Sequence, residues 1–382
     1  MHILILPTAY PNIYNDHSSI FVQDQARALA KHKDIEVNVV GSIPISFKYI
    51  WEKKIFKFGF FEYTNHKVKV KLFLFPSIPK LRRFNNFIRF LLNKVMLKKM
   101  SNDIDLIHVH NSVAGEAALW CKNKFKIPYC VTEHSSAYAR GLVKKYEMNM
   151  YKKIYQNAKC NIAVSKEFCR LLRKIFDLNF KYIPNIVDTN FFLPSKKNYS
   201  NKSFKFINIA NLNKNKNQLS LIKAFSNAFI DNKNVSLLIL GGGPEYDNLM
   251  KEIEKLNMKE QITLYGFATR EEVLRELQNS DSFILSSKYE TFGVVLIESM
   301  SCGLPVISTK CGGPESIIND EKLGLLVEKN DIEELVNAML KVYNHRYNRK
   351  YIRDYIIENF SEPVVVFKLN EIYEEIVCQK LK

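Results

Sequence analysis

Short apolar runs and longer stretches of helical periodicity alternate along the chain. Residues 2–6 form an apolar run that ends at Pro7, and residues 35–40 form another after an amphipathic stretch at 20–31. Short apolar runs bounded by turn residues are typical of buried strands, and apolar positions three or four apart are typical of helices. The order strand, loop, helix, strand predicts a parallel, doubly wound α/β sheet.

The same pattern recurs in both halves of the chain. Further strands are expected in the first half at 68–73, 105–110, 129–134, 161–165 and 180–185, and in the second half at 206–209, 236–240, 262–265, 282–285 and 305–308. Helices should begin at Gln218, Tyr246 and Arg270, and residues 184–202, rich in Pro, Asn and Ser, should link the halves. We therefore predict domains at 1–186 and 187–363, with a last helix at 364–382 that packs back onto the first domain.

One stretch of the second half, residues 288–298, carries candidate chemistry. A short strand precedes it and Gly293 opens an apolar helix, so Glu290 lies on the strand-to-helix loop and Glu298 lies inside the helix. A helix N-terminus offers unpaired N–H groups and the positive end of the dipole to a phosphate. Glu298 leans back toward that end and could accept hydrogen bonds from hydroxyls beside the phosphate. The stretch fits a nucleotide-linked polyol or, alternatively, a capped surface helix with two solvated acids.

Composition places the chain among globular proteins. It has 382 residues, 47% hydrophobic and 25% charged, and contains no apolar run long enough for a membrane-spanning helix. Its first residues lack the basic leader and cleavage site of a signal peptide. The seven cysteines include no C-x-x-C pair, which favours a reducing, cytoplasmic compartment and argues against a structural zinc site.

Positive charge is concentrated in the first half. Residues 1–200 contain 33 Lys and Arg against 14 Asp and Glu, whereas the remainder contains 23 against 25. Such an excess indicates an anionic partner: nucleic acid, a membrane surface or an acidic substrate. A genome rich in Lys, Asn and Ile codons would also add lysines without any functional reason.

Residues 80–99 concentrate that charge in one predicted helix. It has seven basic residues and no acid, with apolar residues at helical spacing, and residues 49–61 add aromatic side chains between lysines. A helix of this kind can lie in an anionic membrane interface. The alternative is a core-packed helix with a solvated basic back. A nucleic-acid partner is less favoured, since no RNA- or DNA-binding motif is present.

Several strand-end segments together form a recognisable set. They lie at 18–22, 132–136, 164–165, 184–188, 210–217, 241–245, 265–267, 290–298, 303–306 and 312–315. This set, in this order, resembles the retaining GT-B glycosyltransferases of family 4 (glycosyl transferases group 1), over nearly the whole chain. The resemblance implies two Rossmann-like parallel-sheet domains that face each other across a cleft. The first would bind the acceptor and the second the nucleotide sugar, with UDP expected before GDP.

The resemblance also implies backbone contacts to the donor in the second domain. The loop at Gly266 and Phe267 would read the base. The N–H groups of Phe292, Gly293 and Val294 would meet the diphosphate and the sugar. These roles use main-chain atoms, so they depend on the shape of each loop.

Charged side chains complete the implied donor site. Glu298 would hold the ribose hydroxyls, Glu290 would face the transferred sugar, and Lys216 would place a positive charge on the leaving diphosphate. The alternative for Lys216 is a solvated lysine in a Lys/Asn-rich loop. Asn211 stands where the family usually has an arginine, so the diphosphate either loses one charged contact or gains it elsewhere.

In the first domain, His134 matches the family's active-site histidine, which contacts the donor sugar. Ser19 stands where the family commonly has a glycine beside the diphosphate. His108 and His110 share one face of a strand, so they could form a metal pair, although core or surface histidines are the simpler interpretation. Residues 241–244 favour a turn before a helix rather than a dinucleotide-binding loop.

The implied reaction is metal-independent sugar transfer with retention, in which the leaving diphosphate takes the acceptor proton. We expect extension of a bacterial surface glycan, on a glycan or lipid-linked acceptor, at the inner face of the cytoplasmic membrane. No cofactor besides the nucleotide sugar is expected. A GT-B-like sugar-nucleotide epimerase and a basic nucleic-acid-binding protein are the alternatives.

Overall fold

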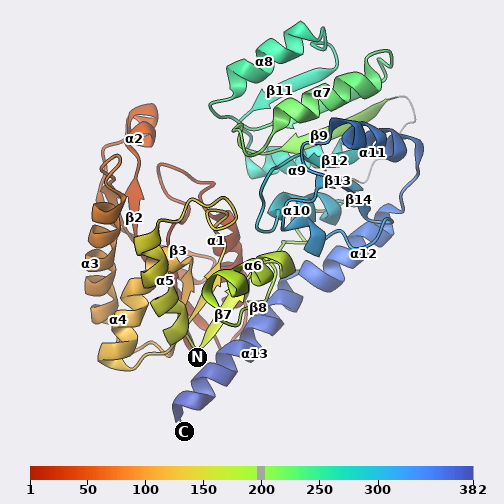
Figure 1. The fold of residues 1–382 in the computed structure, drawn as a ribbon. Coiled ribbons are helices and arrows are strands. Elements are labelled where there is room, and N and C mark those ends of the chain that lie inside the picture. The colour runs from red at the N-terminus through yellow and green to blue at the C-terminus, as the bar shows by residue number, and fades with distance from the viewer. Residues whose placement is uncertain (196–202, 382) are drawn as a thin grey trace. The chain divides into compact units, whose positions relative to one another are not determined.

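The computed structural model describes residues 1–195 and 203–381, and the chain divides into two compact units (Figure 1). Unit 1 comprises Met1–Ile186 together with the helix that begins at Glu362, and unit 2 comprises Val187–Ser361. The predicted linker at 184–202 includes residues 196–202, which lie outside the described residues.

Unit 1 contains an eight-stranded sheet in the order β3-β4-β2-β1-β5-β6-β7-β8. All neighbouring strands are parallel except β3, which runs antiparallel to β4. The strands are β1 (His2–Pro7), β2 (Glu36–Ile45), β3 (Gly59–Asn65), β4 (Val68–Pro76), β5 (Leu106–His110), β6 (Tyr129–Glu133), β7 (Cys160–Ala163) and β8 (Lys181–Tyr182). The strand order turns back between β1 and β5, so their carboxyl ends lie side by side.

Helices cover both faces of this sheet. The main core lies between the sheet and two helices far apart in sequence, α1 (Ile20–Leu29) and α13 (Glu362–Leu381). Val22 of α1 and Tyr373 of α13 are both buried there. The other helices of unit 1 are α2 (Phe47–Lys53), α3 (Arg82–Met100), α4 (Gly115–Phe125), α5 (Lys145–Asn157) and α6 (Lys166–Phe176).

Unit 2 contains a six-stranded, all-parallel sheet in the order β11-β10-β9-β12-β13-β14. Its strands are β9 (Phe204–Ile209), β10 (Val235–Leu240), β11 (Ile262–Gly266), β12 (Ser282–Leu285), β13 (Val306–Thr309) and β14 (Gly324–Val327). The order turns back between β9 and β12, as in the doubly wound dinucleotide-binding folds. Ligands of such sheets bind outside the carboxyl ends of the strands at that point.

The core of unit 2 lies between the sheet and three of its helices, α7 (Gln218–Phe229), α8 (Tyr246–Lys255) and α11 (Ile332–Asn344). The remaining helices are α9 (Arg270–Gln278), α10 (Val294–Ser301) and α12 (Arg349–Phe360), and α10 packs against α12. Short apolar strands buried on both faces are what an all-parallel sheet requires.

The predicted α/β class with parallel sheets is confirmed, and helices begin at Gln218, Tyr246 and Arg270 as the pattern indicated. The strand β14 was not predicted, and the strand expected at 180–185 is reduced to β8 (Lys181–Tyr182). Two further details differ from the prediction. The last helix begins at Glu362, two residues early, because Pro363 lies in the first turn, where its missing N–H leaves no hydrogen bond broken. The strand β3 was not predicted, because its exposed aromatic and polar residues show no clear alternation.

Candidate functional site

Two loops of unit 2 meet where the strand order turns back. Lys216 lies in the loop between β9 and α7, and Glu290 lies in the loop between β12 and α10. Since β9 and β12 are paired neighbours, their following loops lie at the same edge of the sheet. The structure therefore brings together two residues that are 74 positions apart in sequence.

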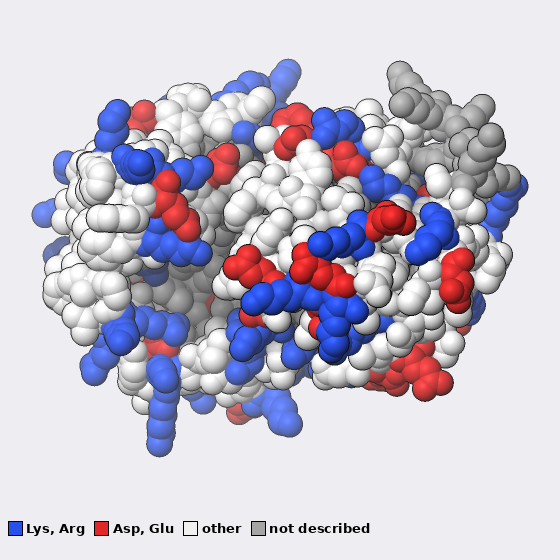
Figure 2. All heavy atoms as spheres, turned by 90° about the horizontal axis from the view of Figure 1, so that it is seen from above, with Lys and Arg blue, Asp and Glu red and all other residues white. Residues whose placement is uncertain are grey.

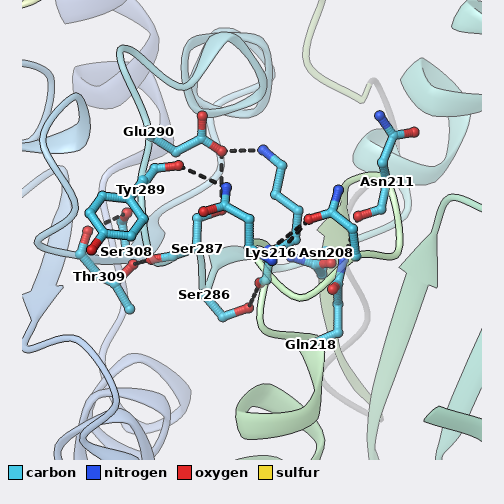
Figure 3. Close-up of polar contacts among 12 residues, drawn as sticks. Asn208, Asn211, Lys216, Gln218, Ser286, Ser287, Tyr289, Glu290, Ser308 and Thr309 are labelled. Carbon is cyan, nitrogen blue, oxygen red and sulfur yellow. Dashed lines mark hydrogen bonds and ion pairs between the residues drawn. The ribbon is translucent and has the colours of Figure 1, made fainter. Parts of the chain in front are cut away.

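Lys216 and Glu290 form an ion pair between Nζ and Oε1 (Figure 3). The same carboxylate oxygen accepts a hydrogen bond from Ser287 Oγ at 3.0 Å. The side chain of Lys216 is 23% exposed and that of Glu290 is 15% exposed, so both are largely shielded from water. Lys216 is thus a partnered charge inside the site and not a freely solvated lysine.

The backbone of the two loops is joined by three further hydrogen bonds. Ser286 Oγ donates to the carbonyl of Lys216 at 2.8 Å, and the N–H of Lys288 donates to the carbonyl of Asn215 at 2.7 Å. Asn215 Nδ2 donates to the carbonyl of Tyr289 at 3.0 Å. The loops are therefore held together by contacts that do not depend on the ion pair, so the ion pair can open without separating them.

A third loop, after β13, supports the site from the other side of β12. The N–H of Glu290 donates to the carbonyl of Cys311 at 3.0 Å. Thr309 Oγ1 donates to the carbonyl of Ser287 at 2.5 Å. Thr309 and Ser287 were not identified from the sequence. The available signal was a pair of polar residues directly after an apolar strand.

The helix α10 begins beside this ion pair. Its N-cap is Gly293, whose φ of 98° lies in the left-handed region that glycine adopts without strain. The side chain of Phe292 is buried and packs on Phe360, with ring centroids 5.9 Å apart. Only the main chain of Phe292 can therefore meet a ligand, together with Gly293 and Val294. Glu298 lies on the second turn of the same helix and is half-buried.

Two glycine-containing loops form the neighbouring part of the site. The N–H of Gly241 donates to the carbonyl of Gly266 at 2.7 Å, which joins the ends of β10 and β11. Phe267 is 73% exposed, and its ring lies so close to Gly242 that a Cβ there would come within 2.3 Å of it. Gly242 therefore makes room for Phe267, whereas a Cβ on Gly241 or Gly243 would meet the carbonyl oxygens of Ala210 and Leu212, so the run suits a tight turn.

Asn211 occupies the same loop as Lys216. Its side chain is exposed, and its carbonyl accepts a hydrogen bond from Gln218 Nε2 at 3.3 Å. In Figure 3 it lies on the opposite side of Lys216 from Glu290. Lys216 is therefore flanked by the carboxylate of Glu290 on one side and by a neutral amide on the other.

In unit 1 the predicted His134 follows β6 at the carboxyl edge of the sheet. Its Nε2 lies 3.0 Å from His110 Nδ1, and its ring lies 4.7 Å from that of Phe21 in α1. Its N–H donates to Asn111 Oδ1 at 2.9 Å. Burial lowers the pKa of His134 to about 3, so the imidazole is neutral at physiological pH.

The other two histidines belong to the core. His108 and His110 are fully buried, and their rings lie 4.4 Å apart, as the shared face of β5 predicts. Both ring nitrogens of His108 are used, at 2.7 Å each, by Tyr373 Oη and Thr132 Oγ1. His108 therefore has no nitrogen left for a metal, and the metal-pair interpretation does not hold.

Asn111 is a residue that sequence reasoning missed. It follows β5 with a φ of 70°, and its Nδ2 donates to Thr8 Oγ1 at 2.9 Å. Because its Oδ1 also accepts from the N–H of His134, Asn111 connects the loops after β1, β5 and β6. An asparagine directly after a strand was the available signal.

Ser19 is the N-cap of α1 and has a left-handed backbone, with φ 51° and ψ 45°. Its side chain makes no capping hydrogen bond. This conformation explains in physical terms why a glycine suits the position, because only glycine adopts it without strain.

The chain matches two family models that follow one another along the sequence. Residues 18–191 match the model described as Glycosyltransferase Family 4, and residues 191–359 match the model described as Glycosyl transferases group 1. Together they cover residues 18–359, which include every strand of both sheets except β1 and every site loop described above except the one after β1. The chain belongs to the GT-B glycosyltransferases.

Named relatives agree with this assignment. The glycosyltransferase is 28% identical over 323 residues to an uncharacterized glycosyltransferase of Methanocaldococcus jannaschii, covering 78% of this chain and 84% of that protein. It is 26% identical over 329 residues to the UDP-Gal:alpha-D-GlcNAc-diphosphoundecaprenol alpha-1,3-galactosyltransferase of Escherichia coli, covering 79% and 84%. Sucrose-phosphate synthase from Thermosynechococcus elongatus shares the fold, with a TM-score of 0.82 and 19% identity over 99% of this chain and 100% of that one.

The helix α3 of this glycosyltransferase turns an apolar stripe outward. Phe84, Phe87, Leu91 and Val95 are all exposed, Phe87 by 54%. The opposite face of the helix buries Asn93, whose Oδ1 accepts hydrogen bonds from the N–H and the Oγ of Ser42, each at 2.8 Å. The same face buries the apolar Met96 and Leu97, so polar and apolar contacts together hold the helix in place. Most of the predicted stripe is exposed, and only Ile88 and Leu92 are half-buried, so the core-packed interpretation fails for the larger part of the stripe.

The basic residues of α3 do not all face solvent. Arg82 pairs with the buried Glu147 at 2.8 Å, and Arg83 lies over the ring of Tyr146. Arg89 is itself buried, and burial lowers its pKa to about 10. Lys98 and Lys99 are exposed. Figure 2 shows Lys and Arg side chains scattered over the visible face of unit 1, with few acids among them.

A second exposed apolar surface lies on α2 and β3. Trp51, Phe56 and Phe60 are exposed by 79%, 67% and 65%, and lysines at 48, 53, 54 and 57 surround them in sequence. Exposed aromatic residues in such number mark an interaction surface. In the described ranges, no helix combines the length and the apolar character that crossing a bilayer requires.

Proposed function

We propose that this glycosyltransferase moves a sugar from a UDP-sugar to a lipid-linked glycan acceptor, with retention of the anomeric configuration, in the synthesis of a bacterial surface polysaccharide. The observation that carries the proposal is the Lys216–Glu290 pair at the turning point of the unit 2 sheet, beside the N-terminus of α10. One cation, one carboxylate and one helix N-terminus are the groups that a sugar diphosphate requires.

The donor is bound along the carboxyl edge of unit 2. The base lies against Gly266 and Phe267, where an exposed aromatic ring is already in place. Glu298 accepts hydrogen bonds from the ribose hydroxyls. The diphosphate lies at the main-chain N–H groups of Phe292, Gly293 and Val294, where the helix dipole favours negative charge. A UDP-sugar is favoured because the Escherichia coli relative is named for UDP-Gal.

Lys216 acts on the leaving group. As the bond between the anomeric carbon and the diphosphate oxygen breaks, negative charge grows on the diphosphate, and Lys216 stabilises it. The acceptor hydroxyl oxygen bonds to the anomeric carbon from the same face, and its proton passes to the departing diphosphate. The lysine and the helix N-terminus carry the electrostatic role, so the reaction does not require a divalent metal.

Glu290 changes partner when the donor binds. In the free protein it neutralises Lys216. A diphosphate carries more negative charge than one carboxylate, so it displaces Glu290 from Lys216 and leaves the carboxylate to accept hydroxyls of the transferred sugar. From the family resemblance, we also assign His134 to the transferred sugar and Ser19 to the diphosphate.

The acceptor half works at an anionic membrane surface. The apolar stripe of α3, the aromatic surface of α2 and β3, and the exposed Lys98 and Lys99 together combine apolar burial with positive charge. The Escherichia coli relative is named for a diphosphoundecaprenol-linked acceptor, which supports a lipid-linked acceptor here. We place the enzyme on the inner face of the cytoplasmic membrane, as a peripheral protein.

A donor screen tests this function. Thermal shift with UDP- and GDP-sugars identifies the donor, and hydrolysis of that donor in the presence of EDTA measures metal-free turnover. The anomeric configuration of the first-formed sugar, read by NMR, distinguishes retention from inversion. Stabilisation by no nucleotide sugar, or formation of an epimeric nucleotide sugar from the donor alone, would overturn the proposal.

A further inference from the structure

Arg89 is a buried positive charge that the proposed donor chemistry does not use. It lies on α3, and only 7% of its surface is exposed. Burial lowers the pKa of Arg89 to about 10, so its guanidinium stays protonated at physiological pH. A buried charge costs much free energy unless an opposite charge or good hydrogen bonds compensate it.

The contacts of Arg89 compensate this charge poorly. Its Nη1 donates to Asn86 Oδ1 and its Nη2 donates to the carbonyl of Thr8, both at 3.4 Å. A charged N–H usually lies about 2.7–2.9 Å from its acceptor, so both hydrogen bonds are long. Among the residues that the structure describes, Arg89 has no ion pair, and its Nε is buried without a hydrogen-bond partner. The guanidinium therefore keeps both its charge and an unused donor.

The neighbours of Arg89 do not supply the missing negative charge. Apart from burial, the groups that shift the pKa of Arg89 are Tyr151, which raises it, and Arg82, which lowers it. The nearby acid, Glu147, pairs with Arg82 at 2.8 Å. The hydroxyl of Tyr151 is buried and, within the described part of the chain, also lacks a hydrogen-bond partner. An oxyanion would accept from both groups and neutralise the charge, whereas a water molecule would satisfy only the donors.

Arg89 lies at the ligand-binding edge of the unit 1 sheet. Thr8, whose carbonyl it contacts, directly follows β1, and the strand order turns back between β1 and β5. Ligands of doubly wound sheets bind outside the carboxyl ends of the strands at this point. Thr8 Oγ1 also accepts from Asn111, which follows β5, so the two strand ends are joined here. The uncompensated charge is therefore placed where a ligand of unit 1 is expected.

The outward face of the same helix is apolar at the level of Arg89. Phe87 and Leu91 lie two residues to either side of it in sequence and are exposed by 54% and 41%. Residues two apart on a helix do not share a face. With a rise of about 1.5 Å per residue, the guanidinium and the apolar side chains are attached within about 3 Å along the axis. A ligand that joins an apolar chain to a phosphate matches both faces.

We propose that Arg89 binds the phosphate of the lipid-linked acceptor, with Tyr151 as a second donor, while the apolar face of α3 meets the hydrocarbon chain. The planar guanidinium pairs with two phosphate oxygens at once. Its Nε and Nη2 lie along one edge, so a phosphate that replaces the Thr8 carbonyl at Nη2 also meets the unused Nε. The inference rests on the proposed lipid-linked acceptor, but the anion site belongs to unit 1 and needs no donor.

Titration calorimetry of the full chain with farnesyl diphosphate, which joins a diphosphate to an apolar chain, tests the site. UDP is present in excess, so that the probe does not occupy the proposed donor site. Arg89→Met keeps much of the side-chain volume and removes the charge, and it should weaken binding by about tenfold or more. Arg83→Gln removes the same charge from an exposed position of α3 and should bind as wild type does. Equal binding by Arg89→Met and wild type would overturn the proposal.

Thermal stability separates a binding role from a structural one. Because a poorly compensated buried charge costs free energy, Arg89→Met without ligand should be at least as stable as wild type. Farnesyl diphosphate should raise the Tm of wild type and not that of Arg89→Met. A lower Tm in the variant with undiminished stabilisation by the probe would assign Arg89 to packing. If Arg89→Met does not fold, Arg89→Lys decides: it keeps the charge, loses the planar fork and should bind several-fold more weakly, and binding equal to wild type would overturn the proposal.

Two further probes distinguish the sources of the phosphate. Inorganic diphosphate should bind more weakly than farnesyl diphosphate, because it lacks the apolar chain, and equal affinities would overturn the lipid-linked assignment. Vesicles of phosphatidylglycerol and phosphatidylcholine should bind Arg89→Met as they bind wild type, because a buried guanidinium does not reach the headgroups of a bilayer. A loss of vesicle binding in this variant would assign Arg89 to the membrane surface and overturn the acceptor site. If wild type does not bind UDP, the proposed donor is wrong, and the dependence of farnesyl diphosphate binding on Arg89 still tests the anion site.

Discussion

Lys216 Nζ and Glu290 Oε1 form an ion pair between the two loops that follow β9 and β12, the neighbouring strands at which the unit 2 sheet reverses its order. The positive charge that a bound diphosphate would need is therefore present in the free protein, where the carboxylate of Glu290 neutralises it. Hydrogen bonds from Ser286, Lys288 and Asn215 hold the loops together by themselves. A diphosphate can therefore replace the carboxylate of Glu290 beside Lys216 while the two loops stay joined.

Lys216→Ala should slow transfer more than it weakens binding, because the charge on the diphosphate grows as the glycosidic bond breaks. We expect kcat to fall by about a hundredfold or more, the range seen when one stabilising donor is removed. Lys214→Ala, an exposed lysine of the same loop, is the matched control and should change kcat by less than about twofold. Steady-state kinetics of both variants measure the effects on kcat and KM separately. Equal rates for Lys216→Ala and wild type would show that Lys216 plays no part.

Glu290→Gln should have opposite effects on nucleotide binding and on transfer. Removal of the carboxylate leaves Lys216 available, so UDP should bind more tightly, by up to about fivefold for a partly shielded ion pair. Sugar transfer should fall, because the group that faces the sugar is altered. Titration calorimetry with UDP measures the first effect and initial rates measure the second. Weaker binding of UDP to the variant would contradict the exchange of partners.

Glu298→Ala tests the ribose contact. Loss of the acceptor for two hydroxyls should weaken UDP binding by about tenfold, since a buried polar group left unpaired costs about 1–3 kcal/mol. The control is a nucleotide without the 2′ and 3′ hydroxyls, which should bind equally to wild type and variant. If the variant discriminates between the two nucleotides as strongly as wild type does, Glu298 does not hold the ribose.

Ser19→Gly should stabilise the protein, although glycine usually destabilises a folded chain. Ser19 has a φ of 51°, a left-handed conformation that costs a residue with a Cβ about 1–2 kcal/mol. After the entropic cost of glycine, a gain of about 0.5–1 kcal/mol in the free energy of unfolding remains. Urea denaturation measures it. Ser18→Gly is the control, and this variant should be neutral or less stable; equal effects would exclude relief of backbone strain.

Some of this architecture could be predicted because it depends on local pattern. The strand Ser282–Leu285 and the helix that starts after Gly293 follow from an apolar run and a glycine. The Lys216–Glu290 pair could not be predicted in the same way, because it depends on which strands are neighbours. Likewise, the contact between His110 and His134 depends on the register of β5 against β6.

At α3, the periodicity of apolar residues left one question open, namely which face of the helix is buried. It identifies which residues share a helix face, and it does so for Phe84, Leu91 and Val95. It does not say which face points inward. The buried face carries the apolar Met96 and Leu97 together with Asn93, which accepts hydrogen bonds from Ser42 of β2. The hydrophobic pattern of a sequence does not reveal a buried polar pair of this kind, since asparagine and serine are usually surface residues.

The outward face of α3 leads to a prediction about membranes. Each basic residue near an anionic surface is worth about 1 kcal/mol, and each apolar side chain that enters the interface adds to that. The enzyme should therefore sediment with vesicles that contain anionic lipid at low salt, sediment poorly with neutral vesicles, and dissociate at high salt. Arg82 is a poor site for a test, because it pairs with the buried Glu147. Lys98 and Lys99 are exposed, so their substitution is a better test.

Three variants separate charge from apolar contact at this surface. Lys98→Gln with Lys99→Gln should weaken binding to anionic vesicles roughly tenfold or more, from the two lost charges. Phe87→Ser with Leu91→Ser should weaken binding even at low salt, because their exposed side chains no longer enter the interface. Lys251→Gln with Lys255→Gln on α8 removes the same charge from unit 2 and is the control, which should bind as wild type does. Donor binding should be unchanged in all three, since none of these residues lies in the donor site. If the α3 variants and the α8 control lost binding equally, only net charge would matter, and α3 would have no special place on the membrane.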